Sequence, residues 1–174
     1  IFVDVEQSVE LPLQRGRIIP LETSDSSLLY DIVSIDQVKD KYFIRSRNKI
    51  LTFDTEGNYL YNISGIGQGN KEYVNLSSFF IKNEELCIYD FNQGRVLVFA
   101  PSGRYLRTEK AVKNSDVECV PQLIRPYGKN KYIAKNSFNG TPGYVTPALS
   151  LLDEKYTITR TLEGHSLNTG FLLF

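Results

Sequence analysis

The 174-residue sequence lacks tryptophan and methionine, has one histidine and two cysteines, and carries no net charge. Its 20 basic residues are balanced by 20 acidic residues. No overall field therefore concentrates a polyanion near the chain, which disfavours nucleic acid as a partner. No apolar run approaches the roughly 20 residues that span a bilayer, so we expect no transmembrane segment. With 41% hydrophobic and 23% charged residues, the composition is that of an ordinary globular protein.

The scarcity of cysteine and histidine narrows the chemistry that the chain can carry. Cys87 lies in an apolar run and Cys119 in a predicted connection, and neither belongs to a C-x-x-C pair. We expect two unpaired structural thiols, with a disulfide between them as the alternative. His165 cannot alone form a multi-histidine metal site, and no G-x-S-x-G nucleophile motif accompanies it, so we interpret it as a solvated loop residue. We predict no catalytic residue, no metal ligand and no cofactor.

What the sequence does contain is an internal repeat. Residues 50–60 align with residues 96–106, and the glycines of the two copies are 103 − 57 = 46 residues apart. Each copy has an alternating strand that ends in an aromatic residue, a turn that ends in glycine, and a second strand that opens with Tyr-Leu. Gly57 and Gly103 can take the positive φ that such a reversal needs. A weaker third copy, residues 148–156, lacks the glycine.

Another pair of predicted strands precedes each hairpin. Units of four short strands in about 40–50 residues are typical of the blades of a β-propeller. The sequence therefore predicts an all-β fold of propeller blades, each of four antiparallel strands, with little helix. A β-sandwich is the alternative, because sandwiches also have short strands at similar spacing. The upstream strands are expected at residues 30–35 and 41–44, 74–81 and 86–89, and 121–124 and 131–134.

The two hairpins resemble the NHL-type propeller repeat, in which a hairpin reads roughly v-F-d-x-x-G-k-y-l. Residues 18–28, followed by residues 65–73, resemble the six-bladed propeller proteins of Bacteroides, in which I-P-L-E-T precedes the first blade and G-x-G-x-G-P-G-E-Y links the first two. The chain has Asn70 and Lys71 where that connection has proline and glycine. The resemblance covers most of residues 1–112. It implies an exported, or lipid-anchored, protein of the bacterial envelope and assigns no catalytic residue.

The predicted blades do not add up to a six-bladed ring. Three explanations stay open: the chain is part of a longer protein, two chains pair edge to edge as a homodimer that completes the ring, or the sheets close differently, as four blades or an open array. The predicted single domain comprises blades at residues 28–64, 74–112 and 120–163, outer strands of a preceding blade within residues 1–27 (1–5 and 17–21), and the start of a following blade at residues 171–174.

Three loops are candidates for binding. The glycine-rich residues 65–69 are not followed by the helix that a dinucleotide site needs, so we interpret them as a connection between blades. Residues 90–94 begin like a calcium loop, but Pro101 stands where the loop needs glutamate, and we interpret them as a hairpin turn. Residues 138–147 form a long connection, rich in aromatic residues and turn formers, that is suited to ligand binding.

Two functions follow from this scaffold. The first is a non-catalytic binding or assembly scaffold of the bacterial cell envelope, in the periplasm or at the outer surface, which presents loops to a protein, peptide or glycan. The alternative is a lyase or hydrolase that acts on polysaccharide or peptide at the central channel. The sequence alone does not identify the ligand-binding residues.

Overall fold

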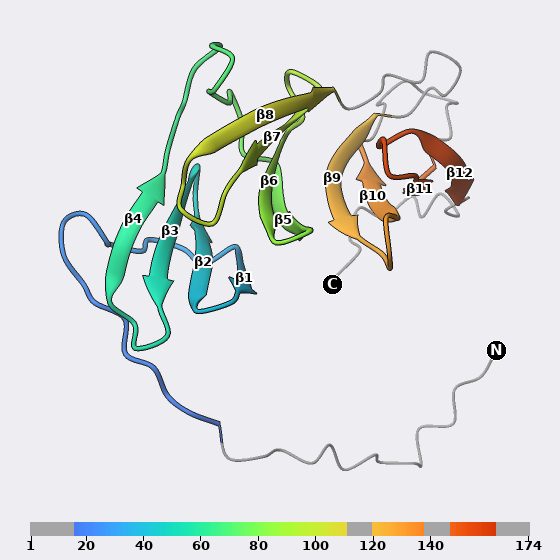
Figure 1. Cartoon of the computed structure of the whole chain (residues 1–174). Helices are drawn as coiled ribbons and strands as arrows, with labels where there is room; N and C mark the ends of the chain where they lie inside the picture. Colours follow the sequence, from blue (N-terminus) through green and yellow to red (C-terminus); the bar gives the residue numbers. More distant parts are fainter. Residues whose placement is uncertain (1–15, 111–119, 138–146, 163–174) are drawn as a thin grey trace, which may run out of the picture.

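The computed structural model describes residues 16–110, 120–137 and 147–162, and within them the chain forms twelve strands and no helix. The strands form three four-stranded antiparallel sheets, each a meander in chain order (Figure 1). The predicted all-β fold of four-stranded antiparallel units is confirmed. The first sheet contains β1 (Ser34–Val38), β2 (Lys41–Ser46), β3 (Lys49–Asp54) and β4 (Tyr59–Ile63). The second contains β5 (Ser78–Lys82), β6 (Glu85–Asp90), β7 (Arg95–Phe99) and β8 (Tyr105–Lys110), and the third contains β9 (Pro121–Pro126), β10 (Tyr132–Asn136), β11 (Leu149–Leu152) and β12 (Ile158–Leu162).

The first strands of two sheets begin later than the sequence predicts. The expected starts are residues 30 and 74, whereas β1 begins at Ser34 and β5 at Ser78. Only the residue just before each strand, Val33 or Ser77, still bonds the backbone of the neighbouring strand. Further upstream, side chains hold the backbone: Tyr30 donates its N–H to the Ser46 hydroxyl, and Val74 donates its N–H to the buried Asp90 carboxylate. Residues 17–21, expected as a strand, form none and lie over the β3–β4 turn, where Glu22 donates its N–H to the Gly57 carbonyl at 2.8 Å.

The three sheets lie side by side in chain order, and their first strands β1, β5 and β9 are neighbours (Figure 1). Two arginines connect neighbouring sheets near these strands. Arg45 of β2 donates to the Ser77 carbonyl at 2.7 Å, and Arg125 of β9 donates to the Phe79 carbonyl at 2.8 Å. The second sheet is therefore held on both sides.

The second sheet is also buried on both faces. One face packs against the first sheet, where Phe79, Leu86 and Leu97 contact its buried side chains. The opposite face packs against the third sheet. Burial on both faces accounts for the nearly continuous apolar sequences of β6 and β7. A strand with one exposed face would instead alternate apolar and polar residues. We call the contact between the first and second sheets the first interface, and the contact between the second and third sheets the second interface.

One turn recurs in all three sheets, between the third and fourth strands. Asp54, Ala100 and Asp153 begin the turns, and each donates its N–H to the carbonyl four residues later. Their carbonyls accept the N–H of the residue three positions on, which is Gly57, Gly103 and Tyr156 in turn. The third copy of the repeat thus folds like the other two, although a tyrosine replaces the glycine.

Candidate functional site

A cleft of about 500 Å³ opens at the second interface. Its floor contains Tyr156, which is buried, and Lys82 and Glu109, which are partly buried. Lysine, glutamate and asparagine side chains surround this floor. The cleft is lined by Lys82, Asn83, Glu109, Lys110, Asn130, Glu154, Lys155 and Tyr156.

The second interface carries charges where the first interface is apolar. The strand registers of the two sheets match, which makes their positions directly comparable: Tyr61 pairs with Thr52 as Arg107 pairs with Val98, 46 residues further along in both cases (107 − 61 and 98 − 52). Three side chains of the first sheet that pack against the second sheet have charged counterparts that face the third sheet. The equivalent pairs are Val38 and Lys82, Tyr61 and Arg107, and Ile63 and Glu109.

Each interface contains an aromatic ring next to a turn, but the ring comes from different sheets. Tyr61 belongs to the sheet that faces the turn, whereas Tyr156 belongs to the turn itself. In the first interface, Tyr61 of β4 covers Gly103 so closely that a Cβ there would lie 2.8 Å from the tyrosine ring, and the Tyr61 hydroxyl donates to the Pro101 carbonyl. In the second interface, the counterpart of Tyr61 is Arg107, and the turn itself supplies the ring of Tyr156. Where the first interface has a tyrosine over a glycine, the second interface therefore has Arg107 and Tyr156.

Tyr156 adopts an unusual backbone conformation to fill this place. Its φ is 61°, in the left-handed region that bulky side chains rarely enter. Its ring is fully buried, 4.9 Å from the ring of Tyr132 and 6.2 Å from the ring of Phe80, measured between centroids. Packing against these two rings offsets the cost of the backbone conformation.

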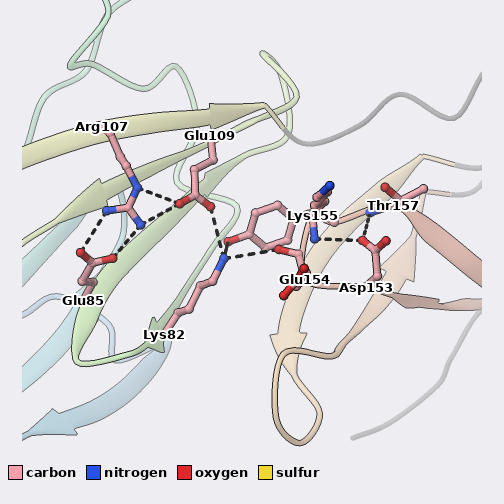
Figure 2. Close-up of polar contacts among 9 residues, drawn as sticks. Lys82, Glu85, Arg107, Glu109, Asp153, Glu154, Lys155 and Thr157 are labelled. Carbon is pink, nitrogen blue, oxygen red and sulfur yellow. Dashed lines mark hydrogen bonds and ion pairs between the residues drawn. The ribbon is translucent and has the colours of Figure 1, made fainter.

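Four charged side chains form a connected network on the second sheet. Figure 2 shows Arg107 and Glu109 of β8 directed toward Glu85 and Lys82. Arg107 donates to both oxygens of Glu85, at 3.0 and 2.7 Å, and to Glu109 at 2.9 Å. The Lys82 ammonium lies 3.4 Å from Glu109. The bidentate contact fixes the orientation of the Glu85 carboxylate.

Lys82 also binds the third sheet. Its ammonium donates to the Glu154 carbonyl and the Tyr156 hydroxyl, both at 3.4 Å, and lies 5.0 Å from the centre of the Tyr156 ring. The Glu154 carbonyl corresponds to that of Pro101, which accepts a hydrogen bond from Tyr61 in the first interface. Lys82 thus replaces the tyrosine hydroxyl as the donor between the sheets.

Three groups at the cleft have pKa values that depart from their ordinary values. Burial acts to raise the pKa of Glu109, but the hydrogen bond from Arg107 and the positive charge of Lys82 outweigh it, and the pKa falls below its ordinary value. The hydrogen bond from Arg107 likewise lowers the pKa of Glu85. Burial raises the pKa of Tyr156 well above that of free tyrosine. The carboxylates stay ionised and the phenol stays protonated at neutral pH.

These shifts predict a loss of stability in acid. Because the pKa values of Glu85 and Glu109 are lower in the folded state, their contribution is present above the ordinary value of 4.5 and is lost as the pH falls through the folded values. Denaturant unfolding at a series of pH values should show this decrease, and Arg107→Gln should flatten it. Arg104→Gln, at an exposed turn position, is the matched control. A pH profile of Arg107→Gln that superposes on that of the unaltered protein would contradict the assignment.

The loops singled out from the sequence lie elsewhere. Residues 65–69 connect the first and second sheets, as predicted, and Tyr73 donates its N–H to Gly65 at 2.7 Å. The predicted hairpin turn at residues 90–94 is confirmed: the buried Asp90 carboxylate accepts the N–H groups of Asn92 and Val74, and Gly94 has φ 59°. His165, Cys119 and residues 138–146 of the third loop lie outside the described residues.

Cys87 is a free, buried thiol whose pKa burial raises to about 12. Among the described residues, no group of three or more histidine, cysteine, aspartate or glutamate side chains is placed to hold a metal ion. No helix in this part of the chain is long and apolar enough to cross a membrane.

A solved structure with a similar fold comes from Bacteroides, the genus that the sequence resemblance indicates. A protein of Bacteroides fragilis described as exported has a TM-score of 0.69 at 18% identity, over 88% of this chain and 43% of its own length. A protein of unknown function from Bacteroides caccae has a TM-score of 0.49 at 14% identity, over 78% of this chain and 50% of its own. This chain therefore spans less than half of the Bacteroides fragilis protein, with which it shares a fold.

A comparison with curated proteins finds no match. The family match, in contrast, extends over nearly the whole chain, from residue 13 to residue 170, and so includes all three sheets and the cleft. The chain belongs to the family described as Domain of unknown function (DUF4934).

Proposed function

We propose that this protein is a binding scaffold of the bacterial cell envelope and that its ligand binds in the cleft at the second interface. The observation that carries the proposal is the exchange of three uncharged interface positions for Lys82, Arg107 and Glu109. The first interface supplies an internal reference, because it shows how the same positions pack when they carry no charged side chain.

The exchange has an energetic cost. Lys82 and Glu109 keep only 16% and 24% of their side-chain surface exposed, so both lose much of their hydration. A pair of partly buried ions is often less stabilising than apolar side chains of similar volume. The left-handed conformation of Tyr156 adds strain at the same place. Partly buried charges and backbone strain in the same cleft are typical of a site whose side chains bind a ligand.

The charge states favour binding over proton transfer. A general acid or base works best when its pKa lies near the working pH. The resolved shifts at this cleft move the pKa values of Glu85, Glu109 and Tyr156 away from neutrality. A site with fixed charges instead suits recognition of a ligand of complementary charge.

Support for the cellular location comes from the similar structures. The Bacteroides fragilis protein that shares this fold is described as exported. We carry that location over to this chain as part of the proposal: an exported or lipid-anchored protein, as the sequence resemblance implies.

We also infer that the three sheets are consecutive blades of a β-propeller. Each sheet packs face to face on the next, and β1, β5 and β9 lie on a common side (Figure 1). Apolar side chains of β1 and of the segment before it, such as Val33 and Ile35, are about half exposed, as expected of a face that a further blade covers. That blade belongs either to the same protein or to a second copy. Light scattering that finds only single chains would exclude the second copy.

The proposed function is tested by a screen on glycan and peptide arrays with a pair of matched variants. Lys110→Glu/Lys155→Glu reverses two exposed charges that line the cleft. Lys135→Glu/Arg160→Glu makes the same change in net charge at exposed positions of the third sheet that do not line it. We expect array signals that the first variant loses and the second keeps. Signals that both variants keep would place the ligand elsewhere and overturn the proposal.

A further inference from the structure

The lining of the cleft identifies the chemical class of its ligand. We propose, resting on the binding function above, that the cleft binds an acidic carbohydrate, a sugar that carries a carboxylate. Three properties of the cleft lead to this class: its size, its hydrogen-bonding groups and the charge that its own ion pairs leave over.

The size fits a short oligosaccharide. A volume of about 500 Å³ falls within the range in which proteins bind small organic ligands, and it suits one or two sugar rings. Lys110 at the end of β8 and Glu154 and Lys155 of the β11–β12 turn line the cleft from the two sheets. A ligand with several rings would leave the others in solvent.

The hydrogen-bonding groups match hydroxyls. Asn83 and Asn130 provide amide donors and acceptors, and both stand at positive φ, 51° and 55°, in the turns that bound the cleft. Glu154 adds carboxylate acceptors and Tyr156 a hydroxyl. Among the residues that the structure describes, none of those lining the cleft is aliphatic. A peptide would need a place for apolar side chains or a row of free backbone groups, which makes a polyhydroxylated ligand the better match.

The remaining charge of the cleft favours an anionic ligand. Lys82 and Arg107 are offset by Glu109 and Glu85 within the network. Of the other charges that line the cleft, Lys110 and Lys155 form no ion pair within the described part of the chain, and Glu154 is the single opposing charge. Two ammonium groups against one carboxylate leave a net positive rim. A carboxylate on the ligand complements this net positive charge.

Isothermal titration calorimetry tests this class directly. Oligomers of galacturonate, of mannuronate and of alternating glucuronate and N-acetylglucosamine are titrated into the protein, with neutral oligomers of galactose and mannose beside them. We expect at least one acidic series to bind about tenfold or more tightly than its neutral counterpart, and its Kd to rise with added salt. Absence of any such preference would overturn the inference.

Variants connect the binding to the cleft. Lys110→Glu/Lys155→Glu should weaken binding of the acidic oligomer about tenfold or more, whereas Lys135→Glu/Arg160→Glu should leave its Kd unchanged. Glu154→Gln removes the opposing carboxylate and should tighten binding severalfold. Equal Kd values for all variants would overturn the assignment of the site.

The ligand class and the proposed function can fail separately. If acidic sugars do not bind but an array signal from a neutral glycan or a peptide is lost with Lys110→Glu/Lys155→Glu, the class is wrong and the binding function stands. If no array signal depends on the cleft, both are wrong.

Discussion

Tyr156→Ala is expected to lower the free energy of unfolding by about 3–5 kcal/mol, the usual cost of removing a fully buried aromatic side chain. The Tyr156 ring packs on Phe80 and Tyr132, and its hydroxyl accepts a hydrogen bond from Lys82. Its removal leaves a cavity at the second interface and withdraws one of the contacts of the lysine. Denaturant unfolding of the two proteins measures the loss.

Tyr156→Gly should be less destabilising than Tyr156→Ala, by about 1 kcal/mol. Both variants lose the ring, but only glycine relieves the positive φ of this position. Tyr132, in the middle of the same aromatic cluster, is the control: it lies in the regular strand β10, so glycine should cost more than alanine there. The same order at both positions would show that the conformation of Tyr156 is not strained.

Removing one partner of the Lys82–Glu109 pair should cost more than removing both. Lys82→Met and Glu109→Leu should each lower the free energy of unfolding by about 2 kcal/mol, because each leaves a partly buried charge with fewer partners. The double variant should lie within about 1 kcal/mol of the unaltered protein, since Arg107 keeps its two hydrogen bonds to Glu85. A double-mutant cycle of denaturant unfolding experiments gives the coupling between the two side chains.

An exposed ion pair of the same types provides the control. Lys39 and Glu84 are 2.7 Å apart, but both are more than half exposed. Solvent screens such a pair, so the cycle of Lys39→Met and Glu84→Leu should show no measurable coupling. If the Lys82–Glu109 cycle gave an equally small coupling, or if the double variant lost as much as the two single variants together, the network would be an ordinary part of the fold.

The turns of the fold could be predicted because each is encoded locally. Gly57 and Gly103 stand where the chain reverses with φ 92° and 80°, and the strands on either side alternate as the repeat requires. The entry to each sheet could not be predicted in this way. Tyr30 and Val74 are bound by side chains from positions 16 residues further along, and no local pattern marks such a contact.

Part of the cleft could have been predicted from differences between the copies of the repeat. The aligned repeat ends at Leu106, and one further residue would have matched Tyr61 with Arg107. A charged residue at a position that is aromatic in the other copy marks a local departure from the shared pattern. The missing glycine at Tyr156 is a second departure, in the third copy.

The remaining part of the site depends on how the sheets pack. Lys82 and Tyr156 are 74 residues apart in the chain and meet only because the second and third sheets are neighbours. Asn83 and Asn130 come from two separate hairpin turns. Periodicity within one strand says nothing about such contacts between sheets, so the cleft follows from the three-dimensional structure alone.

The central claim is that the second interface differs from the first because it binds a ligand. It is tested most directly by comparing the unaltered protein with Lys82→Met/Glu109→Leu on the same glycan and peptide arrays. We expect this folded variant, whose interface has two apolar side chains as the first interface does, to give none of the specific signals of the unaltered protein. Identical signals from the two proteins would contradict it.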